Sequence, residues 1–146
     1  RSSQVIVVDT SALFAIVAKE DERGHFIEIL EETEGTFCSA TTYVETVMAL
    51  TGRSRVTAAE QVRSLVRTFR IDIVAVDAAL ADAAISAFSL YGKGRHRAHL
   101  NFGDCFSYAL AKSRNLPLLF KGDDFIHTDI VPAWRPSIAS SGISDP

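Results

Sequence analysis

Apolar residues along the chain follow two patterns, short buried runs and longer stretches with helical spacing. Val5–Val8 is an unbroken run of valine and isoleucine, which predicts a strand buried on both faces of a sheet. Residues 57–70 instead place apolar side chains three and four positions apart, as on one face of a helix. Read this way, the chain predicts strands at 5–8, 36–39, 71–76 and 117–120, helices at 11–19, 22–32, 43–50, 57–70, 78–91 and 103–114, and a short closing segment at 125–132.

Strands and helices therefore alternate, which predicts an α/β fold with a mainly parallel sheet of about four to five strands and helices on both faces. Either Thr41 or Thr42 is expected to cap the helix that begins at Tyr43. Gly35 is expected to close the second helix. The length of 146 residues suits one domain, expected over 4–134.

The two ends of the chain are expected to lie outside that domain. Residues 1–3 are interpreted as a cloning remnant, and the Ser-, Pro- and Gly-rich residues 135–146 as a flexible tail. No apolar run approaches the roughly 20 residues of a membrane span, so no membrane association is expected. Cys38 and Cys105 lie in apolar segments and are expected to be buried reduced thiols, which favours the cytoplasm.

Acidic residues stand at the ends of several predicted strands and at the starts of helices. Asp9 follows the first strand, Glu45 lies in the helix after the second strand, and Asp104 opens the helix at 103–114. Asp123 and Asp124 follow the last strand. Strand carboxyl ends and helix amino ends share one edge of a parallel sheet, so these acids can meet. Clustered carboxylates resist ionisation unless a cation lies between them, and hard oxygen ligands suit Mg²⁺ or Mn²⁺.

Each acid also has a purely structural interpretation. Asp9 could cap the first helix, Asp104 could interact with a helix dipole, and one of Asp123 and Asp124 could be a solvated loop residue. Glu45 is harder to explain this way, because burying an unpaired carboxylate in an apolar helix is costly.

A basic loop precedes Asp104. It contains Lys93, Arg95, His96, Arg97 and His99, and it lies beside the predicted acidic site. Such a cluster suits a phosphate backbone, although a solubilising loop would have the same composition. The net charge of −3 gives no further indication of a nucleic-acid partner.

Four segments, 7–13, 39–45, 100–109 and 118–125, together resemble the motifs of PIN-domain nucleases, and most closely those of the VapC toxins of bacterial type II toxin–antitoxin modules. The resemblance runs from 5 to 131 in the expected order. Its most specific parts are Asn101-Phe102-Gly103-Asp104 and Lys121-Gly122-Asp123-Asp124-Phe125.

This resemblance implies a PIN-like fold and a Mg²⁺-dependent endoribonuclease, with Mn²⁺ able to substitute. It also implies a cognate VapB-type antitoxin, an RNA substrate, a homodimer and a toxin–antitoxin hetero-oligomer. Asp9 and Asp104 would be the principal metal ligands, and Glu45 a further acid acting directly or through water. In the fourth motif, Asp124 matches better than Asp123. Ser11 or Thr10 would orient the Asp9 carboxylate.

The hypothesis for the reaction is in-line attack on the phosphodiester by water activated at the metal ion, leaving 5′-phosphate and 3′-hydroxyl ends. Lys93, Arg95, His96 and Arg97 would contact the RNA backbone. Neither the RNA nor its cleavage site can be named from the sequence.

Three alternatives compete with this interpretation. A receiver domain needs an acidic pair at its first strand, and a haloacid-dehalogenase-type phosphatase needs an Asp where Ser11 stands, so both are disfavoured. Another PIN-domain nuclease or a non-catalytic binding module remains open; the presence of all four acids argues against the module.

Overall fold

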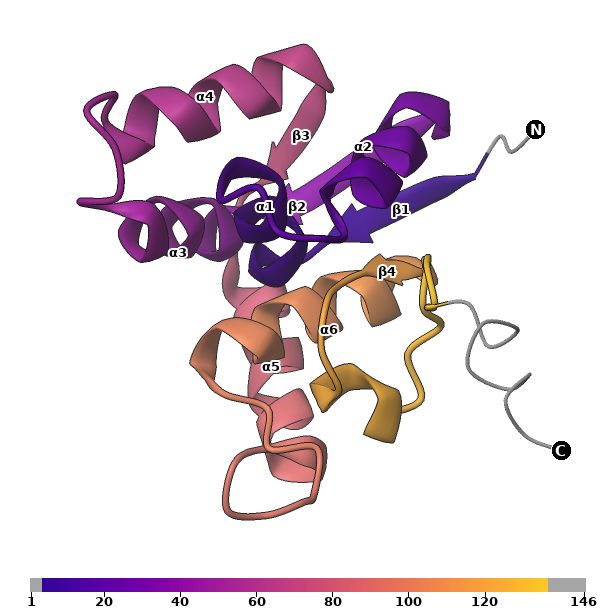
Figure 1. Cartoon of the computed structure of the whole chain (residues 1–146). Coiled ribbons are helices and arrows are strands. Elements are labelled where there is room, and N and C mark those ends of the chain that lie inside the picture. The colour runs from indigo at the N-terminus through magenta and orange to yellow at the C-terminus, as the bar shows by residue number, and fades with distance from the viewer. Residues whose placement is uncertain (1–3, 137–146) are drawn as a thin grey trace, which may run out of the picture.

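The structure, a computed structural model, describes residues 4–136, which form a central sheet with helices on both faces (Figure 1). Its elements in chain order are β1 (Val5–Val8), α1 (Thr10–Val17), α2 (Arg23–Glu32), β2 (Gly35–Ser39), α3 (Ala40–Leu50), α4 (Ala58–Thr68), β3 (Ile71–Val74), α5 (Ala78–Tyr91), α6 (Phe102–Arg114), β4 (Leu118–Leu119) and the 3₁₀ turn η1 (Asp124–His127). The α/β prediction is confirmed.

The sheet has four strands in the order β3-β2-β1-β4, and every pairing is parallel. β1 therefore lies inside the sheet, which explains its unbroken apolar sequence. Two strands are shorter than predicted: β3 ends at Val74, and β4 covers only two residues. β4 pairs with β1 only at Val7 and Val8, and beyond it the chain turns away toward η1.

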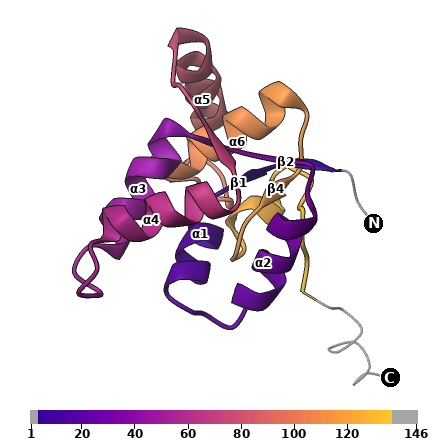
Figure 2. The ribbon, with the colours of Figure 1, turned by 90° about the horizontal axis from the view of Figure 1, so that it is seen from above.

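The side chains of β1 alternate between two apolar layers. Ile6 and Val8 pack with α1, α2 and part of α4, whereas Val7 packs with α5 and α6. Figure 2 shows α1 and α2 on one side of the sheet and α5 and α6 on the other. Both faces are therefore covered, and the carboxyl edge of the sheet is left for polar side chains.

Helix α3 begins earlier than predicted. Ser39, the last residue of β2, caps it by accepting a hydrogen bond from the Thr42 backbone N–H at 3.0 Å. The expected cap at Thr41 or Thr42 is wrong, because the extended backbone needed for a cap occurs at Ser39. Gly35 likewise opens β2, since α2 already ends at Thr33. The short connection brings Glu45 within two turns of the strand end.

Both cysteines are buried and free, as expected. Burial raises the pKa of the Cys38 thiol to about 12 and that of Cys105 to about 11, the latter with a contribution from the Asp104 charge. Within residues 4–136 there is no helix with the length and apolarity of a membrane span. The predicted remnant at 1–3 and the tail from 137 onward lie outside the described residues.

Candidate metal centre

Asp9 lies directly after β1 and is only 3% exposed. Its Oδ2 accepts hydrogen bonds from the Ser11 backbone N–H at 3.0 Å and from Ser11 Oγ at 2.8 Å. Its Oδ1 accepts a hydrogen bond from Ser107 Oγ at 2.5 Å. Asp9 is thus the N-cap of α1, as its structural interpretation required, and it also faces α6 through its second oxygen. The two roles use different atoms and are compatible.

Glu45 approaches the same edge from α3. Its Oε1 accepts a hydrogen bond from Thr10 Oγ1 at 2.8 Å, so Thr10 orients Glu45 whereas Ser11 orients Asp9. The pKa of Glu45 is raised by burial and by the charge of Asp9, against the lowering effect of the Thr10 hydrogen bond. A side chain at Gly103 would overlap the Glu45 carboxylate, so glycine there lets α3 and the first turn of α6 come together.

Asp104 lies in the first turn of α6, where it forms a capping box with Asn101. Its Oδ2 accepts the Asn101 backbone N–H at 3.1 Å. Burial raises the pKa of Asp104 to about 7, and the charges of Asp9, Asp124 and Glu45 act in the same direction. Acids from four separate segments therefore act on one carboxylate.

Asp124 begins η1 and is exposed. It is among the charges that raise the pKa of Asp104, whereas Asp123, one position earlier, is not. This difference favours Asp124 as the fourth acid. Phe125, the next residue, is buried in the core and anchors η1.

No basic side chain neutralises this cluster within residues 4–136. The ion pairs in that part of the chain join Lys112 to Asp129 and Lys121 to Glu20 and Glu22. The described residues also contain no set of three or more acidic, histidine or cysteine side chains arranged closely enough to hold a metal by themselves. Excess negative charge with few direct protein ligands fits Mg²⁺, which usually keeps several waters and binds one or two carboxylates.

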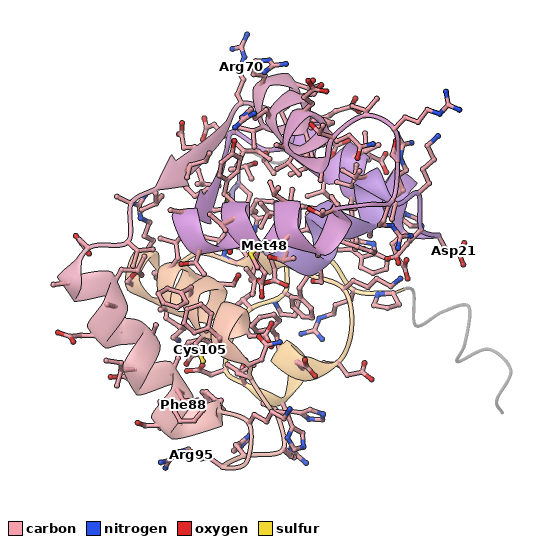
Figure 3. The ribbon with its side chains drawn as sticks, turned by 90° about the vertical axis from the view of Figure 1, so that its left-hand side faces the viewer. Asp21, Met48, Arg70, Phe88, Arg95 and Cys105 are labelled. Carbon is pink, nitrogen blue, oxygen red and sulfur yellow. The ribbon has the colours of Figure 1, made fainter. Side chains whose placement is uncertain are left out.

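The basic loop connects α5 to α6 and thus ends at the Asp104 turn; Arg95 marks it in Figure 3. Lys93, Arg95, Arg97 and His99 are exposed. The Arg95 guanidinium lies 5.2 Å from the Phe88 ring centre. His96 is half-buried, packs edge-on against Tyr91, and accepts the Ala98 N–H at Nδ1. His96 therefore shapes the loop, and the exposed cations are the ones free to meet a phosphate backbone.

Several polar residues near the acids had not been singled out from the sequence. They are Thr42, Thr46, Gly103 and Ser107, all buried. Thr42 and Ser107 stand three positions from Glu45 and Asp104 on their helices, so each shares a face with its acid. Polar residues at that spacing on otherwise apolar faces were the available signal.

Comparison with known proteins agrees with this geometry. The model of the PIN domain family matches residues 6–131. Ribonuclease VapC30 of Mycobacterium tuberculosis (strain ATCC 25618 / H37Rv) is 44% identical over 131 residues, covering 90% of this chain and 100% of that protein. Ribonuclease VapC of Mycolicibacterium smegmatis is 42% identical, covering 86% of this chain and 97% of that protein.

Two solved structures share the fold at low sequence identity. VapC20 of Mycobacterium tuberculosis, described as a sarcin-ricin loop cleaving toxin, matches with a TM-score of 0.70 and 20% identity, covering 86% of this chain and 96% of that one. A toxin–antitoxin complex from Klebsiella pneumoniae matches with a TM-score of 0.67 and 16% identity, covering 90% of this chain and 99% of that one. With the family model and the close relatives, the conclusion is plain: this chain belongs to the PIN-domain family and, within it, to the VapC toxin ribonucleases.

Proposed function

We propose that Asp9, Glu45, Asp104 and Asp124 form the catalytic centre of an endoribonuclease that depends on Mg²⁺, with Mn²⁺ able to substitute. The observation that carries this proposal is the convergence of Asp9, Glu45 and Asp124 on Asp104, whose pKa they raise together with burial. A cation between them would relieve the repulsion that this convergence creates.

Asp9 and Asp104 would hold the cation, and Glu45 and Asp124 would act directly or through water. When bound, the cation would supply a lowered pKa to a coordinated water and positive charge to the phosphate. Ser11 fixes one oxygen of Asp9, and Thr10 fixes one oxygen of Glu45, so two acids are held in defined orientations before RNA arrives. Such preorganisation limits the rearrangement needed during the reaction.

The basic loop would bind the RNA backbone next to this centre. Lys93, Arg95 and Arg97 are exposed there, and no acidic partner in the described residues pairs with them. Their phosphate contacts would position the substrate without selecting its bases. Which RNA is cut depends on features other than these cations.

The test is cleavage of total cellular RNA with Mg²⁺ by Asp9→Asn and Asp104→Asn. Both variants should lose cleavage while keeping the circular dichroism spectrum of the wild type. Asp82→Asn, on the exposed face of α5, is the matched control and should cut normally. If either site variant cuts at the wild-type rate, the site assignment is wrong.

A homodimer is proposed from an exposed apolar face beside the acids. On this face Val44 is 54% exposed, Met48 70% and Phe102 74%, and together with Val76 they line one groove that ends at Glu45. Met48 lies at the centre of the view in Figure 3. Exposed apolar patches of this kind mark protein interfaces. Met48→Glu should therefore shift the sedimentation equilibrium from dimer to monomer, and an unchanged mass would remove this face as the interface.

A VapB-type antitoxin is the second proposed partner, and the resulting toxin–antitoxin hetero-oligomer would form in the cytoplasm. Support comes from family membership and from a structural neighbour that is itself a toxin–antitoxin complex. Co-expression with the antitoxin encoded beside the toxin gene should restore growth that the toxin alone arrests.

A further inference from the structure

Three buried hydroxyl side chains form a hydrogen-bonded chain beneath the acids. Ser39, Thr42 and Ser107 are each 0% exposed. Ser39 Oγ lies 3.2 Å from Thr42 Oγ1, Thr42 Oγ1 lies 3.2 Å from Ser107 Oγ, and Ser107 Oγ lies 2.5 Å from Asp9 Oδ1. The chain thus connects the end of β2, the first turn of α3 and the middle of α6 to the carboxylate after β1.

The direction of donation along this chain is fixed by its end. An ionised carboxylate only accepts, so the single Ser107 proton points to Asp9. Thr42 must then donate to Ser107, and Ser39 donates to Thr42. Ser39 Oγ in turn accepts the Thr42 backbone N–H. Every proton in the chain therefore points toward Asp9, and bonds aligned in this way strengthen one another.

The contact between Thr42 and Ser107 also fixes the spacing of two helices. Thr42 lies three residues before Glu45 on α3, and Ser107 lies three residues after Asp104 on α6. Residues three apart share a helix face, so the hydroxyl pair lies one turn below the two acids. One hydroxyl, that of Ser107, therefore touches Asp9 and the α3 helix that carries Glu45.

We infer that Ser39, Thr42 and Ser107 are positioning residues of the metal centre, and that this hydroxyl chain sets the placement of Asp9, Glu45 and Asp104 that a divalent cation requires. This inference rests on the proposed metal-dependent function. Residues that orient ligands in this way change metal affinity by roughly 10- to 100-fold when removed. Hydrogen bonds that served the fold alone would change stability and leave metal affinity unaltered.

The decisive experiment measures Mn²⁺ binding by electron paramagnetic resonance, without RNA, at a temperature well below the melting point of each variant. Thr42→Val keeps the shape of the side chain and removes the hydroxyl, while Thr42→Ser keeps the hydroxyl. We expect Thr42→Val and Ser107→Ala to bind Mn²⁺ about 10-fold more weakly or worse, and Thr42→Ser to bind like the wild type. Ser113→Ala is the matched control on α6, since its Oγ bonds only the Leu110 carbonyl.

The outcomes separate this inference from the proposed function. Normal Mn²⁺ affinity in Thr42→Val or in Ser107→Ala overturns the role of the hydroxyl chain while leaving the metal centre standing. Absence of Mn²⁺ binding by the wild type overturns the proposed function instead. Should Ser113→Ala weaken binding as much as Ser107→Ala, the effect would be a general one of α6, and the inference would also fail.

Discussion

Removing the negative charge of Asp104 should stabilise the metal-free protein. The carboxyl has an ordinary pKa of 3.8 and a pKa of about 7 in the folded chain, because burial and the three nearby acids disfavour its charged form. Between these two values the folded state holds a proton that the unfolded state has released. The free energy of unfolding therefore falls as pH rises through this window, and the loss is complete above it.

The size of the effect follows from the same two values. A gap of about three pH units corresponds to a ceiling of about 4 kcal/mol. Solvent access to the partly exposed carboxylate lowers this, and Asp104→Asn also gives up about 0.5 kcal/mol of favourable interaction with the α6 dipole. The asparagine oxygen can still accept the Asn101 N–H. We therefore expect Asp104→Asn to be more stable than wild type by about 1–3 kcal/mol above neutral pH.

The assay is urea unfolding of wild type and Asp104→Asn in EDTA across this pH window. The difference between the two proteins isolates Asp104 from other groups, such as Asp129, whose pKa is lowered by its hydrogen bond from Tyr108. Saturating Mg²⁺ should stabilise the wild type and leave Asp104→Asn nearly unchanged. The reasoning is refuted if Asp104→Asn is no more stable than wild type above neutral pH, or if the difference does not vary with pH.

Three further predictions concern other parts of the centre. Gly103→Ala should lose most RNA cleavage, because the added methyl group would displace the Glu45 carboxylate, whereas Gly24→Ala, which meets nothing within 4 Å, should cut normally; equal activities would remove Gly103 from the account. Replacing Lys93 and Arg97 by alanine should reduce the salt dependence of RNA affinity by about 0.7 in log–log slope for each lost phosphate contact, while Arg63→Ala on α4 should not; an unchanged slope would show that the loop does not touch RNA. Cys38 and Cys105, with raised pKa values of about 12 and about 11, should react with a thiol reagent near neutral pH only after unfolding, and rapid reaction of the native protein would contradict their burial.

The positions of the main acids were predictable because they depend on a rule of sheet topology. A parallel sheet collects strand ends and helix starts at one edge, so Asp9, Glu45 and Asp104 could be placed near one another from the order of elements. The structure brings their charges together as that rule requires. Asp124 could be preferred to Asp123 only through the family resemblance, because two neighbouring loop acids look alike without coordinates.

The hydroxyl network was less accessible from sequence. Ser39, Thr41 and Thr42 all stand near the start of α3, and any of them has the chemistry of a cap. Which one serves depends on where β2 stops, and that is set by pairing with β1 and β3. Ser107 donates to a residue 98 positions away, and only the packing of α6 on β1 creates that contact. The short β4 is likewise set by the departure of the chain toward η1.

The central claim is that acids from β1, α3, α6 and η1 share one divalent cation, and the position of Mn²⁺ in the crystal tests it most directly. Anomalous scattering from Mn²⁺-soaked crystals should show a peak about 2.1–2.2 Å from carboxylate oxygens of Asp9 and Asp104, with Glu45 and Asp124 facing it directly or through water. A peak confined to other acids, such as Glu20 and Glu22, with none at Asp9 and Asp104, would contradict the account.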